Sequence, residues 1–225
     1  MGIPVWVMRG ASEAVGAASA ATSGGIATKV APTGAADVAA LDWEALAEAV
    51  RGCKRCGLHA TRTQTVFGVG RRDAKLMVIG EAPGAEEDRQ GEPFVGPAGQ
   101  LLNAMLRAIG LRREDVYIAN ILKCRPPNNR DPRPEEAATC TPYLNRQIEL
   151  IRPRVMLAVG RIASQWLLQT ESPIGRLRGT VSRYGDAGIP LVVTYHPAYL
   201  LRSPHDKAKA WQDLCLVRDL VEEQR

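Results

Sequence analysis

The sequence lacks the features that mark membrane-spanning and exported proteins. No run approaches the roughly 20 consecutive apolar residues that a membrane helix needs, so we expect no membrane association. The first ten residues, MGIPVWVMRG, have no basic segment ahead of an apolar core and do not fit a secretory signal. Trp6 stands where a myristoylation motif requires Ser or Thr. Together these absences favour a cytoplasmic protein.

The motifs of several cofactor-binding and disulfide-rich classes are also missing. Residues 80–88, GEAPGAEED, lack the G-K-[ST] of a P-loop and the G-x-G-x-x-G of a dinucleotide fingerprint. The five cysteines are an odd number in a chain without an export signal, which favours a reducing compartment over a disulfide framework. Gly57 directly follows the Cys53-x-x-Cys56 pair, so the C-x-x-C-H motif of haem attachment is excluded.

Composition divides the chain near residue 40. With 225 residues, 45% of them hydrophobic, the chain is long enough for one domain with a substantial core. Between residues 11 and 40, however, 22 of 30 positions are Ala, Gly, Ser or Thr, and such a stretch has little large apolar surface to offset its ordering entropy. We therefore expect a flexible tail over residues 1–40 and a folded domain over residues 41–225. The net charge of +5 favours a polyanionic partner.

Short apolar runs alternate with helical patterns after residue 40. This alternation is typical of a parallel sheet covered by helices. The fold class predicted is α/β, a three-layer α/β/α sandwich with a central, mostly parallel, four-stranded sheet. The expected strands are residues 75–80, 116–121, 154–160 and 190–195, and the expected helices are residues 98–110, 135–151, 161–169 and 206–224.

Four cysteines have the spacing of a metal centre. Cys53 and Cys56 form a C-x-x-C pair, Cys124 follows after 67 intervening residues, and Cys140 after another 15. Four thiolates satisfy either an iron–sulfur cluster or a structural zinc ion, and the spacing alone leaves both open. In either case the two distant cysteines have to be brought to the pair by the fold. The fifth, Cys215, lies in a predicted helix and is expected in the core.

Three chemically different side chains follow the expected strands. Glu81 comes after the first strand, Asn120 lies near the end of the second, and His196 comes after the last. Because ligands bind at the carboxyl ends of parallel strands, we expect a carboxylate, an amide and an imidazole to meet in one crevice.

Three further segments suit contact with a nucleic acid. Phe94 lies in a Gly/Pro-rich stretch, where an aromatic ring beside a pocket can stack on a planar base. The segment HPAYLLR, residues 196–202, could place Leu201 and Arg202 as a wedge in a duplex groove or could begin a packed helix. Residues 123–134, KCRPPNNRDPRP, suit a phosphate backbone, and the basic residues expected to contact DNA there are Lys123, Arg125 and Arg130.

The order of these motifs resembles the family-4 uracil-DNA glycosylases, the iron–sulfur members of the uracil-DNA glycosylase superfamily. The resemblance covers about residues 44–220 and rests on C-x-x-C, GEAPG-x-x-ED, PFVGPAGQLLN, NILKCRPPNNRDP and HPAYLLR in that order. A related uracil-linking branch carries an extra basic loop and a Gln where this chain has Ala82, and neither feature is present. The resemblance implies excision of uracil from DNA, which leaves an abasic site as the first step of base excision repair.

The resemblance also implies a cofactor, a partner and a residue set. The expected partner is uracil-containing DNA, single- or double-stranded, bound by a monomer in the cytoplasm of a bacterial or archaeal type of cell. By position, the resemblance implies that a [4Fe–4S] cluster is bound by Cys53, Cys56, Cys124 and Cys140. It implies a uracil pocket formed by Glu81, Ala82, Pro83 and Glu87. It also implies that Phe94 stacks on the base, that Asn120 contacts the base edge and that His196 lies beside the scissile bond.

General chemistry suggests how such a set would work. Negative charge develops on uracil O2 as the bond breaks, so a donor aimed at O2, here His196, would stabilise it. Glu81 is the first candidate to orient water, and Glu87 would crowd C5 to exclude thymine. Two other classes stay open from the residues: a zinc-stabilised nucleic-acid-binding module, which would not need the three strand-end residues, and a small-molecule nucleotide hydrolase, which would not need the basic segment.

Overall fold

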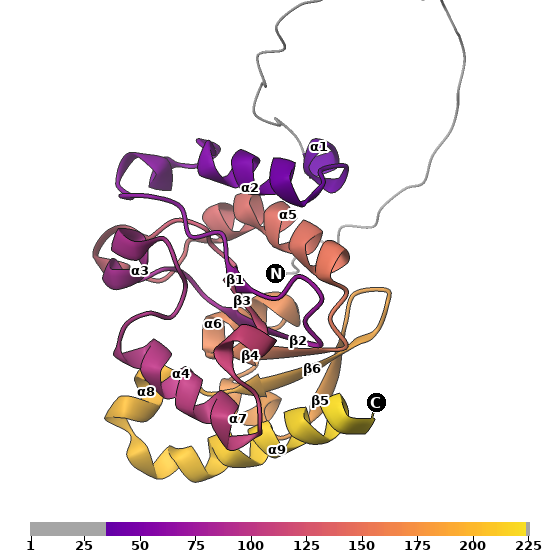
Figure 1. Cartoon of the computed structure of the whole chain (residues 1–225). Coiled ribbons are helices and arrows are strands. Elements are labelled where there is room, and N and C mark those ends of the chain that lie inside the picture. Colours follow the sequence, from indigo (N-terminus) through magenta and orange to yellow (C-terminus); the bar gives the residue numbers. More distant parts are fainter. Residues whose placement is uncertain (1–34, 224–225) are drawn as a thin grey trace, which may run out of the picture. The chain divides into compact units, whose positions relative to one another are not determined.

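A central sheet lies between two helical layers in residues 35–223, the part of the chain that this computed structural model describes (Figure 1). The predicted α/β/α sandwich is confirmed. The strand order is β1-β3-β2-β4-β6-β5. The strands are β1 (Val69–Gly70), β2 (Leu76–Gly80), β3 (Tyr117–Asn120), β4 (Val155–Val159), β5 (Val181–Tyr184) and β6 (Ile189–Thr194).

The predicted number of four strands is wrong, because two edge strands were not expected. The four predicted strands form the parallel centre, in which β2 pairs with β3 and β4, and β4 pairs with β6. Strands β1 and β5 add to the two edges in antiparallel orientation. Strand β1 has only two residues, and β5 alternates exposed and half-buried positions, so neither has the continuous apolar run of a central strand.

The register brings the carboxyl ends of the central strands to one edge. Gly80 pairs with Asn120 at the ends of β2 and β3, and Val159 pairs with Thr194 at the ends of β4 and β6. The segments that carry Glu81 and His196 therefore leave the sheet along the same edge as Asn120, as the alternating pattern predicts.

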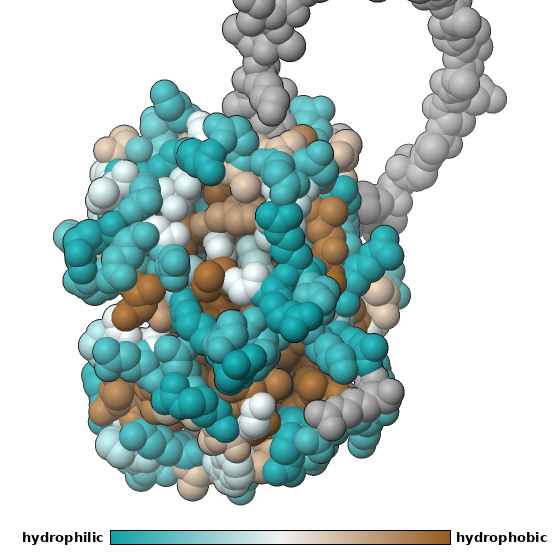
Figure 2. Space-filling model, in the orientation of Figure 1, coloured by the Kyte–Doolittle hydropathy of each residue, from teal (hydrophilic) through white to brown (hydrophobic). Residues whose placement is uncertain are grey.

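Alternate residues of each central strand feed two separate cores. Met77 and Ile79 of β2 pack into one core with side chains from α2, α5 and α6, whereas Leu76 and Val78 pack into the other with α4, α8 and α9. This is the two-residue period of a strand buried on both faces. Figure 1 shows α2 and α5 on one side of the sheet and α4, α8 and α9 on the other. On the face drawn in Figure 2, hydrophilic residues dominate and hydrophobic ones show in smaller patches.

Local signals account for the helix starts. The Asp42 side chain accepts a hydrogen bond from the Ala45 N–H at 2.8 Å and caps α2, and α4, α5 and α8 each begin with proline, which suits the first helical turn. The helices are α1 (Ala35–Ala39), α2 (Trp43–Arg51), α3 (Ala85–Gln90), α4 (Pro97–Ala108), α5 (Pro134–Ile151), α6 (Arg161–Leu167), α7 (Ile174–Leu177), α8 (Pro197–Arg202) and α9 (Lys207–Glu223), with 3-10 turns η1 (Gly57–Ala60), η2 (Arg113–Asp115), η3 (Pro127–Asn129) and η4 (Pro204–Asp206).

One domain boundary differs from the prediction. The predicted tail over residues 1–40 extends too far, because α1 is helical and its Val38 is fully buried in the core. The rest of the predicted tail, residues 1–34, lies outside the described residues. In the acidic segment after β2, residues 85–90 form α3 and Asp88 is buried. No helix among residues 35–223 is long and apolar enough to cross a membrane.

Candidate active site and cysteine cavity

A cavity of about 510 Å³ opens at the carboxyl ends of the parallel strands. The structure brings the three strand-end residues, Glu81, Asn120 and His196, to its wall, as the topology predicts. The remaining predicted pocket residues, Ala82, Pro83, Glu87 and Phe94, also line it, together with Arg130 and Arg202 from the segments expected to contact DNA.

Asn120 lines this cavity and carries an unpaired acceptor. Asn120 is 2% exposed, and its Oδ1 has no hydrogen-bond partner among the described residues. Gly80 makes the arrangement possible, since a Cβ there would overlap Asn120 Oδ1 and lie 2.8 Å from the Phe94 ring. A buried amide oxygen without a partner costs free energy, and a ligand N–H placed there would recover it.

Phe94 forms an aromatic wall beside the amide. Its ring is buried, and its centroid lies 5.6 Å from that of the His196 ring with 30° between the two planes. The Phe94 backbone has a φ of 54°, in the left-handed region that a bulky side chain rarely occupies. The surrounding structure must therefore hold this residue in place.

The hydrogen bonding of His196 fixes the tautomer of its neutral ring. Nδ1 accepts the Ala198 N–H at 3.1 Å at the start of α8, so the ring proton of the neutral form is on Nε2. Burial and, second to it, the positive charge of Arg202 lower the pKa of His196 to about 4, against the opposing negative charge of Glu87. The imidazole is therefore a neutral donor at physiological pH.

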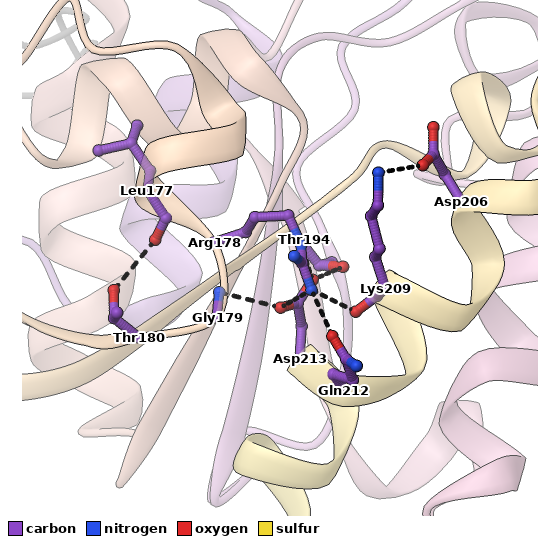
Figure 3. A network of polar contacts seen from close by, with 9 residues as sticks. All are labelled: Leu177, Arg178, Gly179, Thr180, Thr194, Asp206, Lys209, Gln212 and Asp213. Atoms are coloured by element: carbon purple, nitrogen blue, oxygen red, sulfur yellow. Dashed lines mark hydrogen bonds and ion pairs between the residues drawn. The ribbon is translucent and has the colours of Figure 1, made fainter.

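A buried ion pair anchors the strand end that presents His196 (Figure 3). The Thr194 hydroxyl donates to Asp213 Oδ2 at 2.9 Å, and both residues are fully buried. The Arg178 guanidinium contacts both Asp213 oxygens, at 2.9 and 3.1 Å, and the Gly179 N–H donates to Oδ1 at 3.0 Å. This network ties α9 and the segment before β5 to the last residue of β6, so the position of His196 two residues later is defined.

Glu81 is a carboxyl group with an altered pKa. Burial and, second to it, the negative charge of Asp131 raise the pKa of Glu81 to about 7, against the opposing positive charge of Arg161. Asp131 and Arg161 form an ion pair with 2.9 Å between Oδ2 and Nη2. A cleft carboxyl group that titrates near neutrality is typical of an acid–base catalyst.

Glu87 connects the two loops of the pocket. Its Oε2 accepts the Gly84 N–H at 3.1 Å, and its Oε1 accepts the N–H groups of Val95 and Gly96 at 3.0 and 3.2 Å. Its carboxylate thus bridges the segment after β2 and the segment that carries Phe94. The predicted crowding of C5 by Glu87 stays a prediction.

The four predicted metal ligands line a second, small cavity. Cys53, Cys56, Cys124 and Cys140 all contribute to its wall, although they come from three separate segments. Arg62 Nη1 donates to Cys124 Sγ at 2.9 Å, and the Lys123 N–H donates to Cys140 Sγ at 3.3 Å.

Buried thiol and guanidinium groups line this cysteine cavity. Burial raises the pKa of the Cys140 thiol to about 12, and the Lys123 ammonium opposes that rise. Arg55, which also lines the cavity, has a buried Nη1 without a partner in the described part of the chain. Across residues 35–223 no three His, Cys, Asp or Glu side chains are grouped as for a single metal ion.

Comparison with known proteins assigns the chain to a family. The model of the uracil DNA glycosylase superfamily matches residues 67–215. The chain is 47% identical over 178 residues to a type-4 uracil-DNA glycosylase of Archaeoglobus fulgidus, covering 76% of this chain and 89% of that protein. This chain belongs to the type-4 uracil-DNA glycosylases. It is also 47% identical to the type-4 enzyme of Thermotoga maritima over 71% of this chain and 83% of the relative. Its identity to a type-5 uracil-DNA glycosylase of Pyrobaculum aerophilum is 31%, over 58% of this chain.

The basic residues of this type-4 chain occupy different environments. The predicted DNA contact by Lys123 is wrong, because this residue is 1% exposed and its ammonium donates to Asn120 O at 2.9 Å and Gln147 Oε1 at 2.6 Å. Arg125 and Arg130 are half-buried, and Leu201 and Arg202 at the end of α8 are exposed. HPAYLLR forms α8 from Pro197 onward, as one alternative predicted, and the wedge role of the exposed Leu201 and Arg202 stays a prediction.

Several residues that shape the type-4 site were not predicted from the sequence. Glu136 pairs with Arg130 at 2.6 Å, so the guanidinium at the cavity wall already has a partner. Asp131 and Arg161 set the charge around Glu81. The adjacent Arg130 and Asp131 were the signal in the sequence for charged groups near the pocket. The contact between Arg161 and Asp131 spans 30 positions, so no local pattern predicts it.

Proposed function

We propose that this type-4 chain flips uracil out of DNA and hydrolyses its N-glycosidic bond, leaving an abasic site in the first step of base excision repair. The base has to leave the stack because its C1′ cannot be attacked inside a duplex. The observation that carries the proposal is the unpaired Oδ1 of buried Asn120, a residue that lines the cavity together with Phe94 and His196.

Asn120 would select uracil through its amide. Its Oδ1 would accept from uracil N3–H and its Nδ2 would donate to O4, while the Phe94 ring stacks on the base. Cytosine reverses both groups, so the amide would face like partners in a buried site. Leaving these groups unmatched is costly, and sites built on hydrogen bonding can reject such analogues strongly.

His196 would stabilise the departing uracil. As the bond breaks, negative charge develops on O2, and a fixed N–H donor at that position lowers the barrier. The neutral tautomer with its proton on Nε2, enforced by the Ala198 N–H on Nδ1, supports this role. No proton needs to be gained first, because the pKa of His196 is lowered to about 4 by burial.

Glu81 would act on the sugar side of the bond. Its carboxylate would offset the positive charge that develops on the sugar and would accept a proton from the attacking water. This role requires the ionised form, so the pKa of about 7 makes activity sensitive to pH near neutrality.

The four cysteines would hold a [4Fe–4S] cluster. The residues present fit such a group: four sulfurs line one cavity, two N–H groups already donate to them, and Arg55 Nη1 is a further donor without a partner in the described residues. The cluster would supply a cross-link between distant segments, since the hydrolysis moves no electrons.

DNA would lie across the mouth of the cavity. Arg125, Arg130, Leu201 and Arg202 are the contacts proposed there. We also propose that the enzyme acts as a monomer and that it works in the cytoplasm of a bacterial or archaeal type of cell.

Release of free uracil from an oligonucleotide with one uracil tests the proposal, with thymine and cytosine oligonucleotides as controls. We expect release from the uracil substrate alone. Asn120→Asp should abolish most of it, because an ionised carboxylate cannot donate to O4. No release by the wild-type protein, or undiminished release by Asn120→Asp, would contradict the proposal.

A further inference from the structure

Phe94 occupies a conformation that it would not adopt without support. A φ of 54° places a bulky residue in the left-handed region, and such strain persists only where the surroundings over-determine it. The peptide groups on both sides of Phe94 are indeed held by charged side chains from other parts of the chain.

Arg113 holds the carbonyl side. Its Nη2 donates to Pro93 O at 2.6 Å and its Nη1 to Phe94 O at 3.1 Å, with Asn103 Oδ1 a further 3.4 Å contact of Nη1. Arg113 lies in η2, 19 positions after Phe94, and is half-buried. A planar guanidinium with two parallel donors can span two successive carbonyls, whereas a lysine ammonium is a point charge.

Glu87 holds the N–H groups that follow Phe94, and Gly99 packs against the Phe94 carbonyl. Glu87 Oε1 accepts the N–H groups of Val95 and Gly96, which directly follow Phe94. Gly99 in α4 packs so closely that a Cβ would overlap the Phe94 carbonyl oxygen. A cation on the carbonyls and an anion on the N–H groups thus fix one strained residue from both sides.

We propose that Arg113 is a positioning residue for base excision: by holding the carbonyls of Pro93 and Phe94, it fixes the aromatic ring against which the flipped base stacks. The inference rests on the proposed function, in which Phe94 is that stacking ring. Arg113 does not line the cavity and acts through Phe94.

A double-mutant cycle on the full chain tests this inference. Single-turnover excision of uracil is measured for the wild type, Arg113→Ala, Phe94→Ala and the double variant, with thermal melts to verify folding. Arg113→Ala should slow excision about 10- to 100-fold, because a shifted ring misplaces the base, and a misplacement of about 1 Å can cost on the order of 100-fold. In the Phe94→Ala background the same substitution should change the rate by less than about threefold, because the ring it positions is gone.

Two readouts separate positioning from general destabilisation. Arg113→Ala should weaken inhibition by free uracil about tenfold and leave the affinity for an abasic-site duplex unchanged, since only the base contact is altered. Arg113→Lys should fall between wild type and Arg113→Ala. Arg107→Ala is the matched control, because Arg107 is exposed on α4, away from the cavity, and should excise at the wild-type rate.

The outcomes are distinguishable. If Phe94→Ala slows excision but Arg113→Ala has the same effect in both backgrounds, Arg113 acts independently and the inference is overturned while the proposed function stands. An Arg113→Ala protein with the wild-type rate overturns it equally. If Phe94→Ala excises uracil at the wild-type rate, the stacking role in the proposed function fails and the inference fails with it.

Discussion

The ionisation of Glu81 should set the acidic limb of the pH–rate profile. The pKa of Glu81 is raised to about 7 by burial, and the proposed role needs the carboxylate. Because kcat/KM follows the free enzyme, it should rise with pH through about 7 and then level off. At pH 6 only about one-tenth of Glu81 is ionised, so kcat/KM should be about tenfold below its plateau. His196, with its pKa lowered to about 4, stays neutral over this range and adds no limb near 7.

Two neighbouring charges allow the limb to be moved in opposite directions. Asp131→Asn removes a negative charge that raises the pKa of Glu81, so the midpoint should move to lower pH. Arg161→Gln removes a positive charge that lowers this pKa, so the midpoint should move to higher pH. Both side chains are more than half exposed, so neither substitution opens the core.

The assay is kcat/KM for uracil release between pH 5 and pH 9 at constant ionic strength. The midpoint of the limb, and not the height of the plateau, is compared among the wild type and the two variants. Midpoints that stay in place, or that move in the same direction in both variants, would refute the assignment of Glu81.

Two further variants test the cysteine cavity and the packing of the pocket. Cys140→Ser should give protein that lacks iron–sulfur absorbance and is recovered in low soluble yield, because Cys140 connects α5 to the other ligand segments. A folded, brown, fully active variant would contradict the four-cysteine site. Gly80→Ala should lose excision, since its Cβ would displace Asn120 and Phe94, whereas Gly175→Ala, which meets no atom within 4 Å, should not. Single-turnover rates and melting curves of the two variants are compared. Equal excision rates for Gly80→Ala and Gly175→Ala would contradict the close packing of Asn120 and Phe94 against Gly80.

The strand-end residues could be predicted because their placement follows from topology alone. Glu81, Asn120 and His196 come after apolar runs, and parallel strands bring their carboxyl ends to one edge whatever the side-chain packing. The central sheet could also be predicted, because strands buried on both faces appear as continuous apolar runs in the sequence. Strand β5 could not be predicted, since its alternating exposure resembles that of many surface segments.

The contacts that hold the site could not be predicted. Lys123 lies beside Arg125 in a basic segment, and nothing in that pattern indicates that its ammonium is buried against Asn120 and Gln147. Arg113 is one of two adjacent arginines, and only the fold brings it to the Phe94 carbonyl 19 positions earlier. Such long-range contacts depend on packing, which leaves no local periodicity in the sequence.

The most direct test of the account compares chemistry with binding in two variants. His196→Ala should slow the saturating single-turnover rate of uracil excision about 100-fold or more with little loss of DNA affinity, because its donor acts only as the glycosidic bond breaks. Arg130→Ala should do the reverse, weakening DNA affinity and flattening its salt dependence with the saturating rate retained. If His196→Ala instead loses affinity and keeps its saturating rate, the imidazole is a DNA-binding group and the proposed mechanism is contradicted.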